Sequence, residues 1–129
     1  MGYYFNKIVN NLGFDEALER IEKELANEDF DIVSKVDFKD TFSDKLKVDF
    51  LDYTVLGACN TKLAHDAVSA EILLGLMLPC NVLVKRINED SIEVAIVDPV
   101  AALSIFENDD VQKIAIALQE KLVRVINNI

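Results

Sequence analysis

An amphipathic helix, expected from about Asp109 to Asn127, constrains the fold of this chain more than any other feature. Its apolar residues recur at spacings of three and four, so they share one helix face. They are Val111, Ile114, Ala115, Leu118, Leu122, Val125 and Ile126. Asn108 stands where an N-terminal cap is favoured. Because such a stripe is stable only against another apolar surface, the rest of the chain has to supply one.

Five segments have the residue pattern of β-strands. They span residues 3–9, 30–38, 53–59, 80–87 and 91–97. The polar residues 88–90 join the last two as a hairpin. The segment 53–59 is apolar at both odd and even positions. That pattern is typical of a strand that is covered on both faces or lies near an interface.

Further helices are expected between these strands, at residues 14–25, 41–47 and 61–71 and from Pro99. We expect Asp40 to cap the helix at 41–47, with Phe42 and Leu46 facing inward. Either Asn60 or Thr61 is expected to cap the helix at 61–71. The sequence therefore predicts one α+β domain over residues 1–129. Its two layers are a mixed or antiparallel sheet of about five strands and the helices packed on it.

Charge and composition exclude several classes of protein. The chain has 129 residues, of which 13 are basic and 23 acidic, and its net charge is −10. Nucleic-acid binders carry basic patches, so this charge disfavours DNA and RNA as partners. The longest apolar run, residues 72–80, is interrupted by Gly75 and Pro79 and is too short to span a membrane. Two cysteines make no disulfide framework, and no targeting signal is recognised, so we expect a cytoplasmic protein.

The motifs of common catalytic and cofactor sites are missing from the sequence. The four glycines form neither a phosphate-binding loop nor a dinucleotide-binding fingerprint. A single histidine excludes metal sites built on two histidines. The acidic residues lie mostly on polar faces, where solvated surface charge is their ordinary role. We therefore predict no cofactor, and we favour a non-enzymatic protein.

One cluster of residues could carry chemistry, as a ligand site or a thiol site. Its members are Cys59, Asn60, His65, Pro79, Cys80, Asn81 and Asp98. Cys59 ends a strand directly before a helix, whose N-terminus stabilises a thiolate. Together with Cys80 and His65 it could bind zinc and leave the fourth coordination position open. The two cysteines can meet only if their strands are antiparallel neighbours.

Structural roles are the competing interpretation of the same residues. A cysteine is commonly a small buried apolar residue, and a lone histidine is commonly exposed. Asn60 and Asp98 are typical helix caps, and Pro79 is typical of a turn. The apolar segment 72–78 favours a subunit contact over a pocket wall. We rank a homodimeric domain first, a small-ligand or metal-binding domain second and a thiol-dependent redox enzyme third.

Four motifs in this sequence resemble the family called domain of unknown function 302. They are Val55-Leu56-Gly57-Ala58-Cys59-Asn60, Leu63-Ala64, Gly75-Leu76-Met77-Leu78-Pro79-Cys80-Asn81-Val82 and Asp98-Pro99. The most specific part is Leu78-Pro79-Cys80 at this distance after Cys59-Asn60, and the likeness covers nearly the whole chain. The resemblance implies a small α+β protein that forms homodimers and has no assigned biochemical role. The family pattern has proline after the Cys-Asn pair, where this chain has Thr61.

Overall fold

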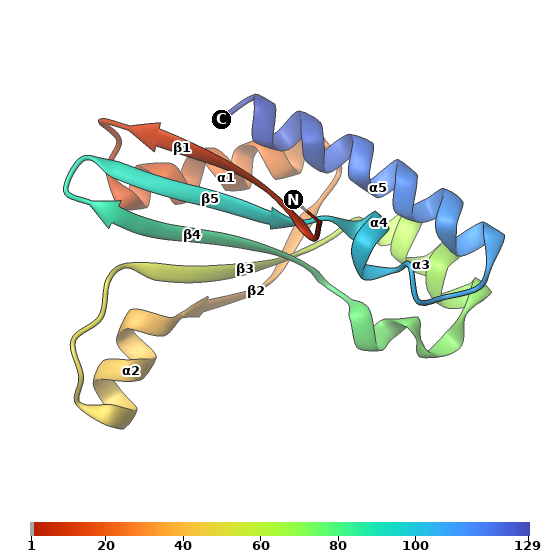
Figure 1. The fold of residues 1–129 in the computed structure, drawn as a ribbon, viewed down its shortest axis with the longest axis horizontal. Helices are drawn as coiled ribbons and strands as arrows, with labels where there is room; N and C mark the ends of the chain where they lie inside the picture. The colour runs from red at the N-terminus through yellow and green to blue at the C-terminus, as the bar shows by residue number, and fades with distance from the viewer. Residues whose placement is uncertain (1) are drawn as a thin grey trace.

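The structure, a computed structural model, describes residues 2–129, so Met1 of the expected domain lies outside the described residues (Figure 1). The elements follow the chain in the order β1 (Tyr4–Asn10), α1 (Phe14–Asn27), β2 (Asp31–Asp37), α2 (Phe38–Leu46), β3 (Tyr53–Cys59), α3 (Thr61–Ala70), η1 (Ile72–Met77), β4 (Cys80–Asn88), β5 (Ser91–Val97), α4 (Pro99–Ala102) and α5 (Asp109–Asn127). Here η1 is a 3₁₀-helix. The α+β class is confirmed.

The five strands form one sheet in the order β1-β5-β4-β3-β2, and each neighbouring pair is antiparallel. Of the two sheet types expected, the antiparallel one is therefore correct. Side chains alternate between the two faces of a strand, so the register assigns each residue to a face. Leu56 lies opposite Val82, Val82 opposite Ile96, and Ile96 opposite Phe5, and these residues share one face.

That face, which we call the covered face, packs against α1 and α5 (Figure 1). Leu18, Ile21 and Leu25 of α1 and Leu118 and Leu122 of α5 are buried against the strand residues. The polar sides of both helices face water, as the apolar spacing predicts. The expected apolar stripe of α5 therefore covers the sheet together with α1.

A second buried cluster lies at the end of the sheet where β3 ends and β4 begins. Here α3 and α4 pack against α5 around the fully buried Leu74 of η1. Each of these three helices has a side-chain cap at its N-terminus: Asn60 for α3, Asp98 for α4 and Asn108 for α5. The expected caps of α3 and α5 are confirmed, as is Asp98 before Pro99.

The α2 region differs from expectation. The helix begins at Phe38, and its cap is Asp37, whose side chain accepts the amide hydrogen bond of Asp40. Asp40 was predicted as the cap, but an aspartate also fits the first turn of a helix, and only the chain direction after β2 decides between the two. Leu46 was expected to face inward and is 64% exposed.

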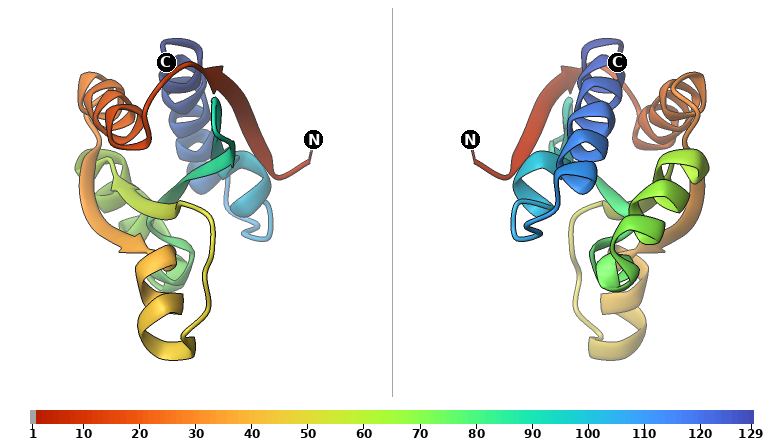
Figure 2. Two further views of the ribbon diagram at one scale, coloured as in Figure 1. Left: turned by 90° about the vertical axis from the view of Figure 1, so that its left-hand side faces the viewer. Right: turned by 90° about the vertical axis from the view of Figure 1, so that its right-hand side faces the viewer.

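Along the opposite side of the sheet, which we call the uncovered face, no helix of residues 2–129 packs apart from α2, which contacts β3 at Tyr53 (Figure 2). Val55 lies opposite Leu83 and Leu83 opposite Ala95, and all three are half-buried on this face. The sheet is strongly twisted, and the α2 region projects beyond its β2–β3 edge (Figure 2). The chain thus buries one side of its sheet and leaves apolar residues on the other.

Gly57 shows how closely β2, β3 and the start of β4 approach on the uncovered face. A Cβ atom added at Gly57 would lie 2.7 Å from the Pro79 Cγ and would also collide with the Ser34 hydroxyl. We predict that Gly57→Ala lowers the free energy of unfolding by about 1–3 kcal/mol, because extra volume in a packed site causes strain.

Urea denaturation monitored by circular dichroism measures this change. Gly75→Ala is the matched control, since a Cβ there meets no atom within 4 Å. Equal stability of the two variants would contradict the close approach at Gly57.

Candidate functional site

The antiparallel register brings Cys59 and Cys80 to the same end of the sheet. Cys80 lies opposite Ala58, so Cys59 is one residue beyond that pair. Both cysteines are free thiols, and both line a cavity of about 10 Å³ enclosed by apolar residues of α3, η1 and α5. A single water molecule needs roughly that volume, so the cavity has no room for a substrate.

Both thiols are held in their protonated form. Burial raises the pKa of Cys80 to about 11, and the neighbouring Cys59 adds to the shift. Burial also raises the pKa of Cys59, and the nearby carboxylate of Asp31 acts in the same direction. Because the thiolate is the reactive form, these surroundings make both cysteines poor nucleophiles at neutral pH.

His65 lies apart from the two cysteines. Its side chain is 75% exposed, and its Nδ1 is 3.2 Å from a carboxylate oxygen of Asp66. Among residues 2–129, no group of three or more histidine, cysteine, aspartate and glutamate side chains is placed to hold a metal ion. The structure therefore does not bring Cys59, Cys80 and His65 together as a set of zinc ligands.

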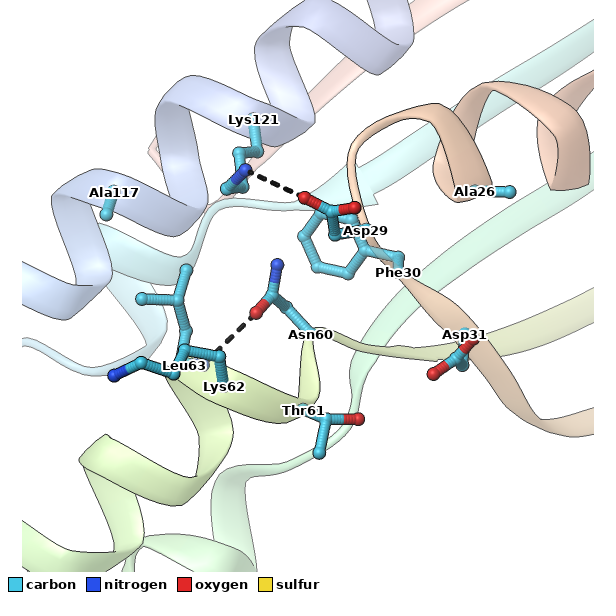
Figure 3. Close-up of a pocket in the computed structure, with 10 residues that line it drawn as sticks. All are labelled: Ala26, Asp29, Phe30, Asp31, Asn60, Thr61, Lys62, Leu63, Ala117 and Lys121. Atoms are coloured by element: carbon cyan, nitrogen blue, oxygen red, sulfur yellow. Dashed lines mark hydrogen bonds and ion pairs between the residues drawn. The ribbon is translucent and has the colours of Figure 1, made fainter.

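Asn60 connects the end of β3 to α3 and borders a hollow between α3, α5 and the segment that joins α1 to β2. Its side-chain oxygen accepts the amide hydrogen bond of Leu63 at 3.1 Å, and its amide nitrogen donates to the Glu28 carbonyl at 3.5 Å. The hollow has a volume of about 580 Å³ (Figure 3). Asn60 thus has a structural role that satisfies its buried polar atoms.

The charges around this hollow already pair with each other. Lys121 lies 3.9 Å from Asp29 (Figure 3). Lys62 forms a 2.6 Å ion pair with Asp66, which does not itself line the hollow. Asp31 adds a second carboxylate to the rim. With its lysines paired and two acidic residues present, the hollow is poorly suited to an anionic ligand.

Pro79, Cys80 and Asn81 lie on a second, apolar hollow of about 240 Å³ between η1, β4 and α4. Pro79 follows a cis peptide bond and leads into β4. Asp98 caps α4 by accepting from the amide of Val100, and it also accepts a hydrogen bond from Gln119. Of the candidate residues at this hollow, only Asn81 offers it an exposed polar side chain.

A third depression lies on the uncovered face, and we call it the apolar groove. Its volume is about 400 Å³. It is lined by Tyr3, Tyr4, Tyr53, Val55, Asn81, Leu83, Glu93, Ala95, Ile96 and Val97. Glu93 in the groove accepts a hydrogen bond from Asn6 at 2.8 Å and is 3.3 Å from the Lys85 ammonium. These two partners lower the pKa of Glu93, Asn6 contributing most.

Of these groove residues, only Asn81 is among the candidate site residues that the sequence indicates. The feature that points to them is the segment 53–59, which is apolar at both odd and even positions. The structure shows that Leu56 and Ala58 face the core while Tyr53 and Val55 face the groove. A strand with two apolar sides thus borders a surface that its own helices do not cover.

Comparison with known proteins agrees with the fold. The family model for domain of unknown function DUF302 matches residues 5–129. The chain belongs to the DUF302 family. A crystal structure of an uncharacterized conserved DUF302 protein from Bacillus stearothermophilus superposes with a TM-score of 0.84 at 22% sequence identity, covering 96% of this chain and 97% of that one. No curated protein shows a significant match to the sequence.

At that identity, the likeness to the solved DUF302 structure establishes a shared fold. The biochemical function of the family is unknown, as its description states. None of the helices in the described part of this DUF302 chain is long and apolar enough to cross a membrane.

The two thiols give a test that depends on pH. Because both pKa values are raised, we predict that neither Cys59 nor Cys80 reacts rapidly with iodoacetamide at pH 7. Labelling of Cys59 should increase only at alkaline pH, because burial and the Asp31 carboxylate hold its pKa above the ordinary cysteine value. Cys80 should label only after denaturation in urea, because it is also buried.

Mass spectrometry of the digested protein measures labelling at each cysteine separately. Fast labelling of Cys59 at pH 6 would contradict this prediction and support a thiol-dependent enzyme.

Proposed function

We propose that this DUF302 protein is a non-enzymatic domain that works as a homodimer in the cytoplasm, with the uncovered face of the sheet as its subunit contact. The observation that carries the proposal is the apolar middle of that face, which Asn6, Asn81 and the Lys85–Glu93 pair flank. Leu83, Val55 and Ala95 lie in its middle, and Tyr4 and Val97 lie beside them. In an antiparallel sheet, a face meant for water carries polar residues instead.

The charges on the uncovered face favour association. Its central charged pair, Lys85 and Glu93, is an ion pair in which each residue neutralises the other. The helix layer on the covered side carries many acidic residues, among them Asp15 and Glu16 of α1 and Asp109 and Asp110 of α5. Two chains of net charge −10 therefore meet with least repulsion through the sheet.

The same charge distribution supports a second copy over other partners. Nucleic acid is disfavoured because a polyanion is repelled by an acidic chain. The final helix, α5, has its apolar stripe buried in the core and so offers no apolar face of its own to a partner. A two-fold contact joins a surface to itself, so a neutral apolar face is suited to it.

Two rival functions have weaker support. A small ligand in the hollow beside Pro79 would find Asn81 as its one exposed polar contact among the candidate residues. A thiol-dependent enzyme would need a reactive thiolate, and burial opposes that state at Cys59 and Cys80. The two free cysteines fit a reducing compartment, which is why the proposal includes the cytoplasm.

The proposal is tested by the mass of the protein in solution. Light scattering at micromolar concentration should give twice the 14.5 kDa of the chain. We predict that Leu83→Glu shifts the protein to monomer, because a charge buried in an apolar contact is costly. The dissociation constant should rise at least a hundredfold, which corresponds to about 2.8 kcal/mol.

Two variants serve as controls. Ile116→Glu adds the same charge at a 49% exposed position of α5, on the helix layer, and should leave the dimer intact. Leu76→Glu tests η1, where Leu76 is 83% exposed. A monomeric wild type would overturn the proposal. Dissociation by Leu76→Glu but not by Leu83→Glu would also overturn it, in favour of the 72–78 segment.

A further inference from the structure

The α2 region has no buried residue of its own and stands away from the other helices (Figure 1, Figure 2). We call residues 38–52 the arm: it consists of α2 and the segment that leads from α2 back to β3. Its strongest contact with another element is to β3. A segment of this kind gains little stability from the core of its own chain.

The arm nevertheless has a defined shape. Four aromatic rings, those of Phe38, Phe42, Phe50 and Tyr53, form a closed series of contacts with centroid distances of 5.1–5.9 Å. Lys39 donates a hydrogen bond to the Phe50 carbonyl at 2.6 Å, which ties the two limbs of the arm together. Such internal contacts hold the arm in one conformation before any partner binds, so little ordering entropy remains to be lost.

The base of the arm is anchored to the sheet. The Arg86 Nε donates to the Asp52 carboxylate at 2.7 Å, and the Arg86 backbone amide donates to the Asp52 carbonyl at 2.9 Å. The side chains of both residues are about 70% buried, so this ion pair is shielded from water. The anchor fixes the direction in which the arm leaves the edge of the sheet.

Several apolar side chains on the outside of the arm are exposed among its charged ones. Leu46, Val48 and Leu51 are 64%, 45% and 40% exposed, and the aromatic ring of Phe50 is 39% exposed. A rigid projection with this many exposed apolar side chains is unusual for an isolated monomer. It has the properties of a contact surface whose partner is missing from a single chain.

The apolar groove runs obliquely across the uncovered face, as the register shows. At one end is Tyr53 of β3, which also belongs to the aromatic cluster of the arm. The groove continues over Leu83 of β4 to Val97 of β5, which lies opposite Tyr4 of β1. Its far end is bounded by Tyr3 and Tyr4, of which Tyr3 is 69% exposed.

This surface therefore has a projection at one end and an open aromatic end at the other. Consider a two-fold axis that crosses the middle of the groove, perpendicular to the groove and parallel to the sheet. Such an axis brings the arm end of each copy to the tyrosine end of the other, so the same contact forms at both ends. We infer that the arm of each copy lies on the Tyr3–Tyr4 end of the groove in its partner. This inference rests on the proposed homodimer and identifies how its two copies interlock.

The size of the sheet supports a contribution from the arm. Five strands of seven to nine residues present a face of about 23 by 24 Å, or roughly 550 Å². A stable specific interface buries about 800 Å² on each partner. The flat outline is smaller than the accessible surface of the side chains on that face, and the exposed apolar side chains of the arm add further contact area to it.

The direct test is a cross-link between two differently substituted copies. One copy carries Tyr3→Cys and the other Leu46→Cys, both with Cys59→Ser, while the buried Cys80 stays unreactive. The copies are mixed, allowed to exchange and treated with a short bismaleimide. We expect a linked species of twice the chain mass that contains both substituted peptides, detected by mass spectrometry.

The matched control replaces Leu46→Cys by Ile116→Cys, at an exposed position of α5 on the helix layer. This pair should give no linked species. Suppose that the wild type is a dimer but that the cysteine at position 3 links to position 116 as readily as to position 46, or links to neither. That result would overturn the arm inference and leave the homodimer standing. A wild-type monomer would overturn the homodimer itself.

A second measurement does not depend on cross-linking. The double variant Leu46→Glu with Leu51→Glu changes two exposed residues, so we expect its circular dichroism and unfolding midpoint to match the wild type. Its dimer dissociation constant should rise at least tenfold, whereas Ile116→Glu should leave the constant unchanged. An unchanged constant in the double variant would overturn the inference.

Discussion

The helices of this DUF302 chain cover one face of its sheet, and most features of the structure depend on that one-sided cover. Leu56, Val82 and Ile96 are fully buried beneath α1 and α5, so the covered face stabilises the monomer. Val55, Leu83 and Ala95 alternate with them and reach only partial burial. Because the same strands supply both sets, the chain cannot bury the second set without another molecule.

Most of the candidate site residues from the sequence lie at one end of the sheet. At the end of β3 the chain turns into α3, and nearby it enters β4 and leaves β5 for α4. Where strands connect to helices in this way, the helix N-termini need capping side chains, and the close packing needs small apolar residues. Asn60 and Asp98 are those caps, and Cys59 and Cys80 fill a tightly packed space beneath α3 and α5. Helix capping and packing thus explain the position of these residues without a reaction.

The sequence predicted the local structure closely where the apolar periodicity was strong and, for the helices, where a capping residue stood at the N-terminus. The strands at 53–59 and 91–97 and the helix at 109–127 have the expected bounds. The prediction was weakest at α2, where Asp37 and Asp40 both suit a helix start and no stripe of buried residues fixes the face. For the candidate site, the sequence indicated the residues around the end of β3 and the start of β4. It could not show that the exposed His65 lies apart from Cys59 and Cys80.

By itself the sequence determined the fold class, the five strands, the α-helices and the two-sided apolar character of β3, because periodicity and capping are properties of neighbouring residues. It did not show the 3₁₀-helix η1. Only the tertiary structure decided that the sheet is antiparallel throughout and that Cys59 and Cys80 share one end of it. It also decided which apolar side of β3 is left uncovered and that the arm stands beside it. These outcomes depend on contacts between residues far apart in the chain, and local patterns do not record such contacts.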